Sequence, residues 1–389
     1  MKTSDIPIIE LSGTPRARGR LYGETTKLLI AKVVEAWRED LGNFSQGNAD
    51  GKHQNPNAYL DAFFSQTHYM SSIQKWAPSL LEEVRGIAEG AEQSFETILG
   101  LQLMDEEWIF GLRRCLDRPI TKCTAFGVSN QSNGISYAGQ NMDIPSWVEG
   151  TQVLLRVMPT DNSPEALVFA FAGIIGLNGL NANSLGITCN TLAQLNYATD
   201  GLPVSFIVRS ILERHNMEEA EQFLRTIKHA SGQNYILSSP RDMRCFECCG
   251  TSIVQYLPET TPGRVFHSNH PLVNQDENDL LPPDKRRNKS TVARLDSIGN
   301  RLGDMTRKMT LEDIKSALAA HDDPGNPVSR KINPTNVDNS MGYTAGSSIY
   351  ELGSKPRLHF AAGPPCETAF EIFEFNTTSS LDMNQLIIK

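Results

Sequence analysis

Two short segments near the middle of the chain have the pattern of paired β-strands joined by a tight turn. Residues 122–127 (Lys-Cys-Thr-Ala-Phe-Gly) open the first segment, and residues 139–143 (Gly-Gln-Asn-Met-Asp) end the second. Between them lies a run of turn-forming residues that ends in Asn133-Gly134, a dipeptide typical of two-residue hairpin turns. β-Branched and aromatic residues flank this run, as expected of strands. A hairpin closed by this turn would place Asp143 beside Cys123. We therefore interpret Cys123 as the central functional residue of the chain.

Length and charge exclude several classes of protein. The chain has 389 residues, enough for a large core or for two cores, and its 39% hydrophobic and 21% charged residues are ordinary for a globular protein. The net charge of -9 and the absence of a long Lys/Arg run argue against nucleic-acid binding. No apolar run reaches the roughly 18 to 20 residues of a membrane span, and residues 1–7 lack the apolar centre of a signal peptide. We therefore expect a cytoplasmic protein with no nucleic-acid and no membrane partner.

The seven cysteines are scattered along the chain, and an odd number fits reduced thiols better than a disulfide framework. Cys245, Cys248 and Cys249 form the densest group. A structural zinc site usually has four ligands in two such pairs, and the sequence has no second cysteine pair. Residues 245–249 also have the pattern of a strand. We therefore expect no metal and no organic cofactor.

Hydrophobic spacing divides the chain into a helical first part and a mixed second part. Residues 8–122 are expected to be mostly helical, with helices over 24–37, 59–76, 78–87 and 95–112. Beyond residues 115–123, β-rich segments alternate with two helix pairs, at 204–213 and 218–230 and at 291–302 and 310–320. Thr310 and Asp313 have the spacing of a capping box. This order indicates helices layered on antiparallel sheets.

A cysteine nucleophile needs a base to activate the thiol and hydrogen-bond donors to stabilise the oxyanion. Histidine is the usual base, and His267 and His270 are the histidines at a plausible position. The residues around Cys123 lack the signature of papain-like proteases. Cleavage before Cys123 offers a second base, because the new α-amino group has a reference pKa of about 7.7 to 8.0. Asp143 then lies where it can orient that amine, and the residues alone leave both bases open.

The segment Cys123-Thr124-Ala125, followed by residues 139–143, resembles the N-terminal-nucleophile hydrolases of the acyl-coenzyme A:6-aminopenicillanic acid acyltransferase (penicillin acyltransferase) family. These enzymes are related to choloylglycine hydrolase and penicillin V acylase. The resemblance covers nearly the whole chain. It includes four further segments, in the order and approximate spacing of the family, at residues 13–23, 178–190, 267–270 and 363–367.

The resemblance implies an α+β fold, a four-layer αββα sandwich with a helical N-terminal prosegment. Residues 1–122 correspond to the prosegment and residues 123–389 to the catalytic domain. Self-cleavage between Lys122 and Cys123 is implied, after which the two fragments stay together as an α/β heterodimer. The question of a higher oligomer stays open.

The same resemblance implies roles for individual residues. Cys123 corresponds to the nucleophile of both self-cleavage and catalysis, and Asp143 corresponds to the residue that holds the α-amine. Asn269 corresponds to the residue that lends its side-chain amide to the oxyanion hole. Asn190 corresponds to a residue that flanks this hole and supplies backbone or side-chain hydrogen bonds.

Two arginines compete for one further role. Arg294 corresponds to a family arginine near the nucleophile, and Arg330 is the alternative, because the loop before Arg294 varies in length. Bile-salt and penicillin V hydrolases resemble this motif with arginine in place of Gln140, so bile-salt hydrolysis is not expected of this chain.

The expected reaction is hydrolysis of the amide bond of a small N-acyl compound through a thioester on Cys123. Two alternatives stay open. In the first, the acyl group passes from a coenzyme A thioester or an amide to an amine. In the second, the chain stays unprocessed and serves as a non-catalytic binding scaffold.

Overall fold

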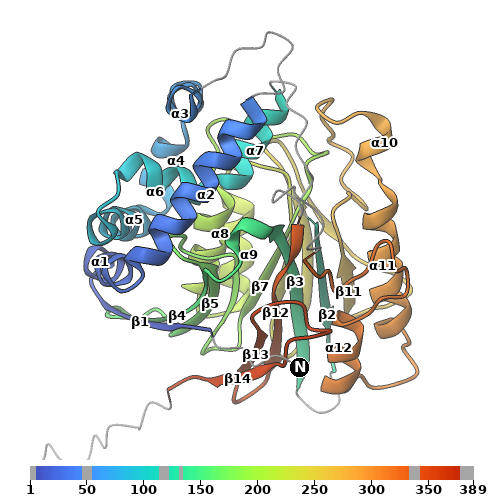
Figure 1. Ribbon diagram of the computed structural model, residues 1–389. Helices are drawn as coiled ribbons and strands as arrows, with labels where there is room; N and C mark the ends of the chain where they lie inside the picture. Colours follow the sequence, from blue (N-terminus) through green and yellow to red (C-terminus); the bar gives the residue numbers. More distant parts are fainter. Residues whose placement is uncertain (1–5, 46–54, 114–121, 131–134, 333–341, 377–389) are drawn as a thin grey trace, which may run out of the picture.

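The computed structural model describes residues 6–45, 55–113, 122–130, 135–332 and 342–376. Two β-sheets lie face to face at the centre, and helices cover both outer faces (Figure 1). The predicted four-layer αββα sandwich is therefore confirmed. Within the described ranges, no helix has both the length and the apolar character that a membrane span requires.

The first sheet has eight strands, all antiparallel to their neighbours except β1, which runs parallel to β4. In spatial order they are β1 (Ile8–Gly13), β4 (Gln152–Pro159), β5 (Ala166–Phe171), β6 (Asn178–Asn181), β7 (Gly186–Thr191), β8 (Gln233–Ser238), β9 (Met243–Cys248) and β10 (Ile253–Tyr256). The strand predicted over 245–249 corresponds to β9, which contains Cys245 and Cys248 and ends one residue before Cys249.

The second sheet has six antiparallel strands and carries the predicted hairpin at its centre. In spatial order they are β11 (Arg264–His267), β2 (Lys122–Val128), β3 (Ser136–Pro145), β12 (Gly342–Leu352), β13 (Arg357–Ala361) and β14 (Glu371–Glu374). Apolar side chains fill the space between the sheets. Phe169 of β5 and Phe360 of β13, for example, have ring centroids 4.7 Å apart.

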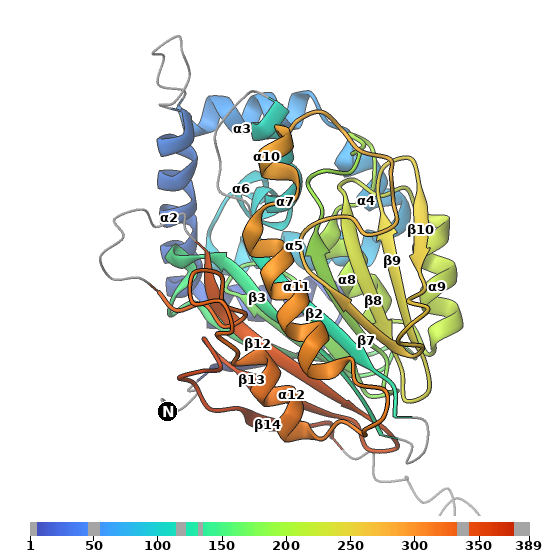
Figure 2. The ribbon, with the colours of Figure 1, turned by 90° about the vertical axis from the view of Figure 1, so that its right-hand side faces the viewer.

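Helices of the first part of the chain and the pair α8 and α9 cover one side, and α10 to α12 cover the other (Figures 1 and 2). The first group is α1 (Pro15–Thr25), α2 (Lys27–Ser45), α3 (Pro56–Ser65), α4 (Tyr69–Trp76), α5 (Pro78–Ala91), α6 (Phe95–Gln102), α7 (Met104–Arg113), α8 (Val204–Leu212) and α9 (Met217–Thr226). The second group is α10 (Pro283–Arg286), α11 (Lys289–Leu302) and α12 (Leu311–Leu318). The capping box predicted from Thr310 and Asp313 is present at the start of α12.

Two of the four helices expected in the first part are each divided in two, because residues 66–68 separate α3 from α4 and Leu103 separates α6 from α7. The apolar spacing continues across each break because the helices on both sides pack on the same core. Periodicity therefore does not reveal an interruption of one to three residues. The helix expected over 24–37 is α2, which begins at Lys27, and α1 before it was not among the expected helices.

The N-terminal segment, from β1 to α7, packs closely against the rest of the molecule. Strand β1 extends the first sheet, and side chains of α1 to α6 belong to the same apolar core as those of both sheets. A buried charge cluster adds a second connection, because Glu83 of α5 accepts hydrogen bonds from Arg18 of α1 (2.8 Å) and from Arg209 of α8 (2.9 Å). Arg209 also donates to the carbonyl oxygen of Ile175.

The backbones of α1 and α5 touch through glycines. A Cβ atom at Gly19 would lie 1.9 Å from the carbonyl oxygen of Glu83, and one at Gly86 would lie 2.2 Å from that of Arg16. Real Cβ atoms do not approach so closely, so only glycine allows this contact. The glycines explain why the segment at residues 13–23 packs so tightly against α5.

Candidate active site

The predicted hairpin of β2 and β3 places the two key residues of the sequence analysis next to each other. In its register Cys123 is opposite Met142, and Lys122 is opposite Asp143. The predicted Asn133-Gly134 turn lies outside the described residues. The hairpin itself is confirmed, and it brings the backbone of Asp143 within one position of Cys123.

Side chains hold the backbone of Cys123 from both ends. Its N–H donates a hydrogen bond of 2.7 Å to Oδ1 of Asn269, which lies just after β11. Its carbonyl oxygen accepts a hydrogen bond from Nη1 of Arg294 on α11. Arg294 also donates to Thr124 Oγ1 (2.9 Å) and to Asn269 Oδ1 (3.0 Å). Asn269 and Arg294, separate in sequence, thus meet at the nucleophile candidate.

The structure distinguishes the two competing arginines. Arg294 is wholly buried, and burial lowers its pKa to about 10, so the guanidinium is still a cation at neutral pH. The backbone of Arg330 exchanges hydrogen bonds with Thr344, and the charge of Arg330 is near enough to lower the pKa of Arg294 further. Among the described residues, however, no hydrogen bond joins Arg330 to Cys123. Arg294 is therefore the arginine at Cys123.

The thiol of Cys123 is a poor nucleophile in the intact chain. The residue is buried, and this burial raises the pKa of the thiol to about 12. The negative charge of Asp143 raises it further, whereas a backbone hydrogen bond from Asp143 opposes the shift. The sulfur lies 3.3 Å from the sulfur of Met142. At neutral pH the group is a protonated thiol and needs a nearby base.

Asp143 is buried, and its Oδ1 accepts a hydrogen bond of 2.6 Å from Thr344 Oγ1 on β12. This contact fixes the carboxylate beside the start of β2.

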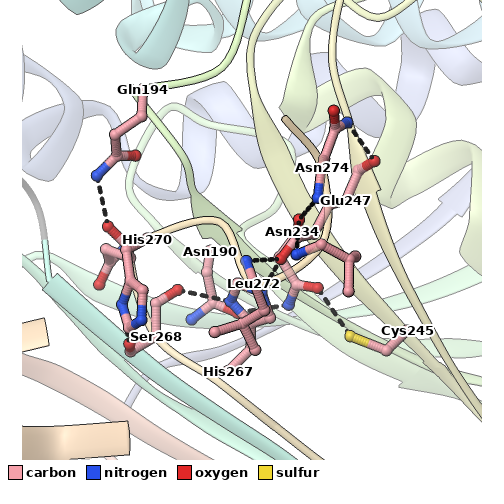
Figure 3. A network of polar contacts seen from close by, with 12 residues as sticks. Asn190, Gln194, Asn234, Cys245, Glu247, His267, Ser268, His270, Leu272 and Asn274 are labelled. Carbon is pink, nitrogen blue, oxygen red and sulfur yellow. Dashed lines mark hydrogen bonds and ion pairs between the residues drawn. The ribbon is translucent and has the colours of Figure 1, made fainter. Parts of the chain in front are cut away.

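A chain of hydrogen bonds orients Asn190, at the end of β7 (Figure 3). Cys245 Sγ donates to Asn234 Oδ1, and Asn234 Nδ2 donates to Asn190 Oδ1, both over 2.9 Å. The side chain of Asn190 is buried, and its Nδ2 has no hydrogen-bond partner within the described ranges. The Nδ2 group of Asn190 is therefore an unused donor between the two sheets. Among the described residues, Asn190 makes no hydrogen bond to Cys123.

His267 and His270, the two candidate bases, make contacts with residues other than Cys123. His267 Nε2 lies 2.8 Å from Glu247 Oε1 and Nδ1 lies 2.9 Å from the carbonyl oxygen of Ser268 (Figure 3). His270 Nδ1 lies 3.0 Å from Thr291 Oγ1, and burial lowers the pKa of His270 to about 4. Among the described residues, neither ring hydrogen-bonds Cys123. The geometry does not form the Cys–His pair that the sequence left open.

Gln140 has a bridging position that the sequence did not reveal. From β3 its Oε1 accepts a hydrogen bond of 3.1 Å from the backbone N–H of Cys189 on β7, and its Nε2 donates to the carbonyl oxygen of Cys189. Both residues are buried. Gln140 thereby connects the two sheets next to the candidate nucleophile.

Cys123 lies in the wall of a mainly apolar cavity. The N-terminal helices, the hairpin and the first sheet all contribute to it, so the site is shared by segments from both sides of residue 122. Its apolar wall includes Trp37, Leu101, Met104, Trp108, Met142, Ile144, Phe171, Ile174, Leu177 and Val204. Of these wall residues, only Met142 lies in a motif that the sequence revealed, the hairpin segment 139–143. The others lie in ordinary amphipathic elements without a motif, so no sequence pattern places them beside Cys123.

Comparison with known proteins decides the family. The family model described as acyl-coenzyme A:6-aminopenicillanic acid acyl-transferase matches residues 129–345, more than half of the chain. The chain belongs to this acyltransferase family. The predicted resemblance is confirmed, and so is the enzyme class, acyltransferases and amidohydrolases that act on amide bonds.

A curated relative and two solved structures show similarity as well. The acyl-coenzyme A:6-aminopenicillanic-acid-acyltransferase 40 kDa form of Emericella nidulans is 26% identical over 267 residues, which are 68% of this chain and 70% of the relative. A conjugated bile acid hydrolase mutant from Clostridium perfringens matches with a TM-score of 0.44 and 12% identity, over 65% of this chain and 97% of that one. Penicillin V acylase from Agrobacterium tumefaciens matches with a TM-score of 0.43 and 15% identity, over 66% and 87%.

The matched range of the acyltransferase family includes four of the five predicted site residues, namely Asp143, Asn190, Asn269 and Arg294. Cys123 lies six residues before its start. The assignment of Cys123 therefore depends on the hairpin and on the contacts described above.

Proposed function

We propose that the chain is a self-processing cysteine enzyme that hydrolyses the amide bond of a small N-acyl compound. One observation carries the proposal. The backbone N–H of Cys123 is held by the side chain of Asn269, and its carbonyl oxygen is held by Arg294. These contacts fix the position of the backbone nitrogen of Cys123. An enzyme whose nucleophile also supplies its own α-amino group as the base needs that nitrogen in a fixed position.

Self-cleavage comes first in this proposal. The sulfur of Cys123 attacks the carbonyl carbon of Lys122, the C–N bond to Cys123 breaks, and the nitrogen takes up the thiol proton. Water then hydrolyses the resulting thioester, which leaves a new carboxyl end on Lys122 and ends the covalent connection of residues 1–122 to Cys123. Cys123 is left as the first residue of the second fragment, and Asn269 Oδ1 is already positioned to accept from its α-amine.

Catalysis then repeats the same chemistry on a substrate. The α-amine accepts the thiol proton, the sulfur attacks the acyl carbonyl, and the leaving amine takes the proton. Asp143 orients the α-ammonium, and the free Nδ2 of Asn190 is a donor for the oxyanion. Water completes the cycle by hydrolysing the thioester.

The cleaved fragments stay together in this proposal as a heterodimer. The shared apolar core, the pairing of β1 with β4 and the Arg18–Glu83–Arg209 cluster support this. The cavity wall supports it too, because helices before residue 122 supply part of it. Loss of the first fragment would open the site.

Acyl transfer to an amine is a second candidate, favoured by the activity in the names of the family and of the Emericella nidulans relative. A coenzyme A thioester would be a suitable acyl donor. Trapping of the acyl-enzyme tests both candidates. An acid-quenched reaction with an N-acyl substrate should increase the mass of the Cys123 fragment by one acyl group, and hydroxylamine should divert the product to a hydroxamate. A turnover that proceeds without any acylated fragment, even in a rapid quench, contradicts the thioester.

A further inference from the structure

The cavity beside Cys123 contains a carboxylate that the proposed mechanism does not use. Asp105 lies in the first turn of α7, in the N-terminal segment, and lines the same cavity as Cys123. Its charge is close enough to Cys123 to contribute to the raised pKa of that thiol. The charge of Asp105 therefore acts at the position of the candidate nucleophile, from within the wall of the same cavity.

One oxygen of this carboxylate is occupied and the other is available. Oδ2 of Asp105 accepts hydrogen bonds from Thr191 Oγ1 (2.8 Å) and from Gln233 Nε2 (2.6 Å). In the part of the chain that the structure describes, no group donates to Oδ1. The two contacts through Oδ2 fix the side chain against β7 and β8, which leaves Oδ1 as a fixed acceptor.

The surroundings make this acceptor selective. Most of the cavity wall is apolar, and burial raises the pKa of Asp105 because the charged form loses hydration. A ligand that donates a hydrogen bond or carries a positive charge restores the lost interaction. A ligand that places its own carboxylate there adds repulsion and a second desolvated charge.

We propose that Asp105 is a specificity-determining residue, which accepts through Oδ1 a hydrogen bond from an ammonium or N–H group of the substrate. The preferred substrate class is then an apolar acyl compound that carries such a donor within the cavity, and compounds with a carboxylate at that place are rejected. The inference rests on the proposed function, because it takes the cavity beside Cys123 as the substrate site.

Ligand binding to a Cys123→Ala protein tests this inference without any turnover. The probes are n-octylamine, n-octanol and n-octanoate, whose binding is measured by calorimetry at pH 7. We expect the amine to bind at least about tenfold more tightly than the alcohol, and the octanoate to bind most weakly. Because no chemistry is involved, failure of self-cleavage or of amide hydrolysis leaves this result interpretable.

Two variants on the Cys123→Ala background identify the residue. Asp105→Asn keeps an oxygen for Thr191 and Gln233 but turns the other atom into a donor, so the amine should lose about tenfold in affinity and octanoate should gain. Glu106→Gln is the matched control, a buried carboxylate next to it on α7 that does not line the cavity. It should keep the original order of ligands.

Three results would overturn the inference. They are equal binding of amine and octanoate to the Cys123→Ala protein, an unchanged amine preference in Asp105→Asn, and the same change in Glu106→Gln as in Asp105→Asn. The first of these needs no substitution at Asp105, so the inference stays testable even when Asp105→Asn does not fold.

Discussion

The side-chain oxygen of Asn269 accepts a hydrogen bond of 2.7 Å from the backbone N–H of Cys123, across 146 residues of sequence. The same oxygen accepts a second hydrogen bond from Arg294, while Nδ2 of Asn269 donates to the carbonyl oxygen of Thr191. Asn269 therefore connects the nitrogen of the proposed cleavage bond to a buried cation and to the other sheet. In the uncleaved chain its amide thus contacts the nucleophile through oxygen, and the predicted oxyanion role of its N–H groups stays a prediction.

Arg294→Lys should slow self-cleavage by at least about tenfold. The guanidinium serves three acceptors around Cys123 at once, and a lysine ammonium is a point charge that does not reproduce this planar fork. The measurement is the time course of cleavage, followed by mass spectrometry in freshly refolded protein. Arg330→Lys is the matched control, because Arg330 carries a charge near Arg294 but, among the described residues, makes no hydrogen bond to Cys123, Thr124 or Asn269. An equal slowing in both variants would show that Arg294 has no special role.

Glu106→Gln should flatten the pH dependence of stability. Burial raises the pKa of Glu106 from 4.5 to about 8, so between these values the folded chain binds a proton that the unfolded chain lacks. The free energy of unfolding of the parent therefore falls as pH rises from about 5 to 8, by up to about 1.4 kcal/mol per pH unit from this group. The glutamine has no proton to lose, so its curve lacks this fall.

Urea denaturation at pH 5, 6, 7 and 8 measures this difference. Both proteins should carry Cys123→Ala, so that each unfolds as one intact chain. Parallel curves for the parent and for Glu106→Gln would mean that Glu106 titrates normally in the folded state.

Gly86→Ala should prevent α1 from packing on α5. The new Cβ would lie 2.2 Å from the carbonyl oxygen of Arg16 and 2.7 Å from the backbone nitrogen of Arg20, and backbone atoms cannot move aside as a flexible side chain can. We expect a loss of several kcal/mol of stability, measured by urea denaturation. Gly299→Ala in α11 is the matched control, because nothing lies within 4 Å of its Cβ and helix propensity should favour alanine. Similar losses at both positions would contradict the close contact of the two helices.

Glu83→Gln should destabilise the intact chain by about 3 to 5 kcal/mol, because it leaves the buried Arg18 and Arg209 without their counter-charge. Glu82→Gln is the control on the same helix. Glu82 pairs with Arg16 at the exposed surface, where the loss should stay below about 1 kcal/mol. Melting curves of both variants on the Cys123→Ala background measure the two losses of stability. A Glu83→Gln protein as stable as Glu82→Gln would contradict the expected role of the Arg18–Glu83–Arg209 cluster in stability.

The elements that could be predicted from the sequence are those whose signals lie within a few residues of one another. The hairpin around Cys123 follows from turn residues and strand formers, and the capping box of α12 follows from Thr310 and Asp313. Strand β1 was not predicted, because its pairing with β4 depends on residues almost 150 positions away. The breaks at residues 66–68 and at Leu103 were missed because apolar spacing continues through them.

Contacts of the candidate site between residues far apart in the sequence were equally hard to predict. Arg294 and Asn269 were named from the family pattern, and the structure places both at Cys123. The free donor of Asn190 depends on Asn234 and Cys245, which are adjacent to it only in the folded sheet. The cavity carboxylate Asp105 has no motif around it. Long-range contacts of this kind leave no period or spacing in the sequence.

The most direct test of the account is the intact mass of the purified protein under denaturing conditions, compared with Cys123→Ala. We predict two fragments that meet between Lys122 and Cys123 in the wild type, and one uncut chain of 43.1 kDa in the variant. An uncut wild type that still hydrolyses amides would contradict the α-amine mechanism and return the role of base to His267 or His270. An uncut and inactive wild type would instead support the non-catalytic scaffold.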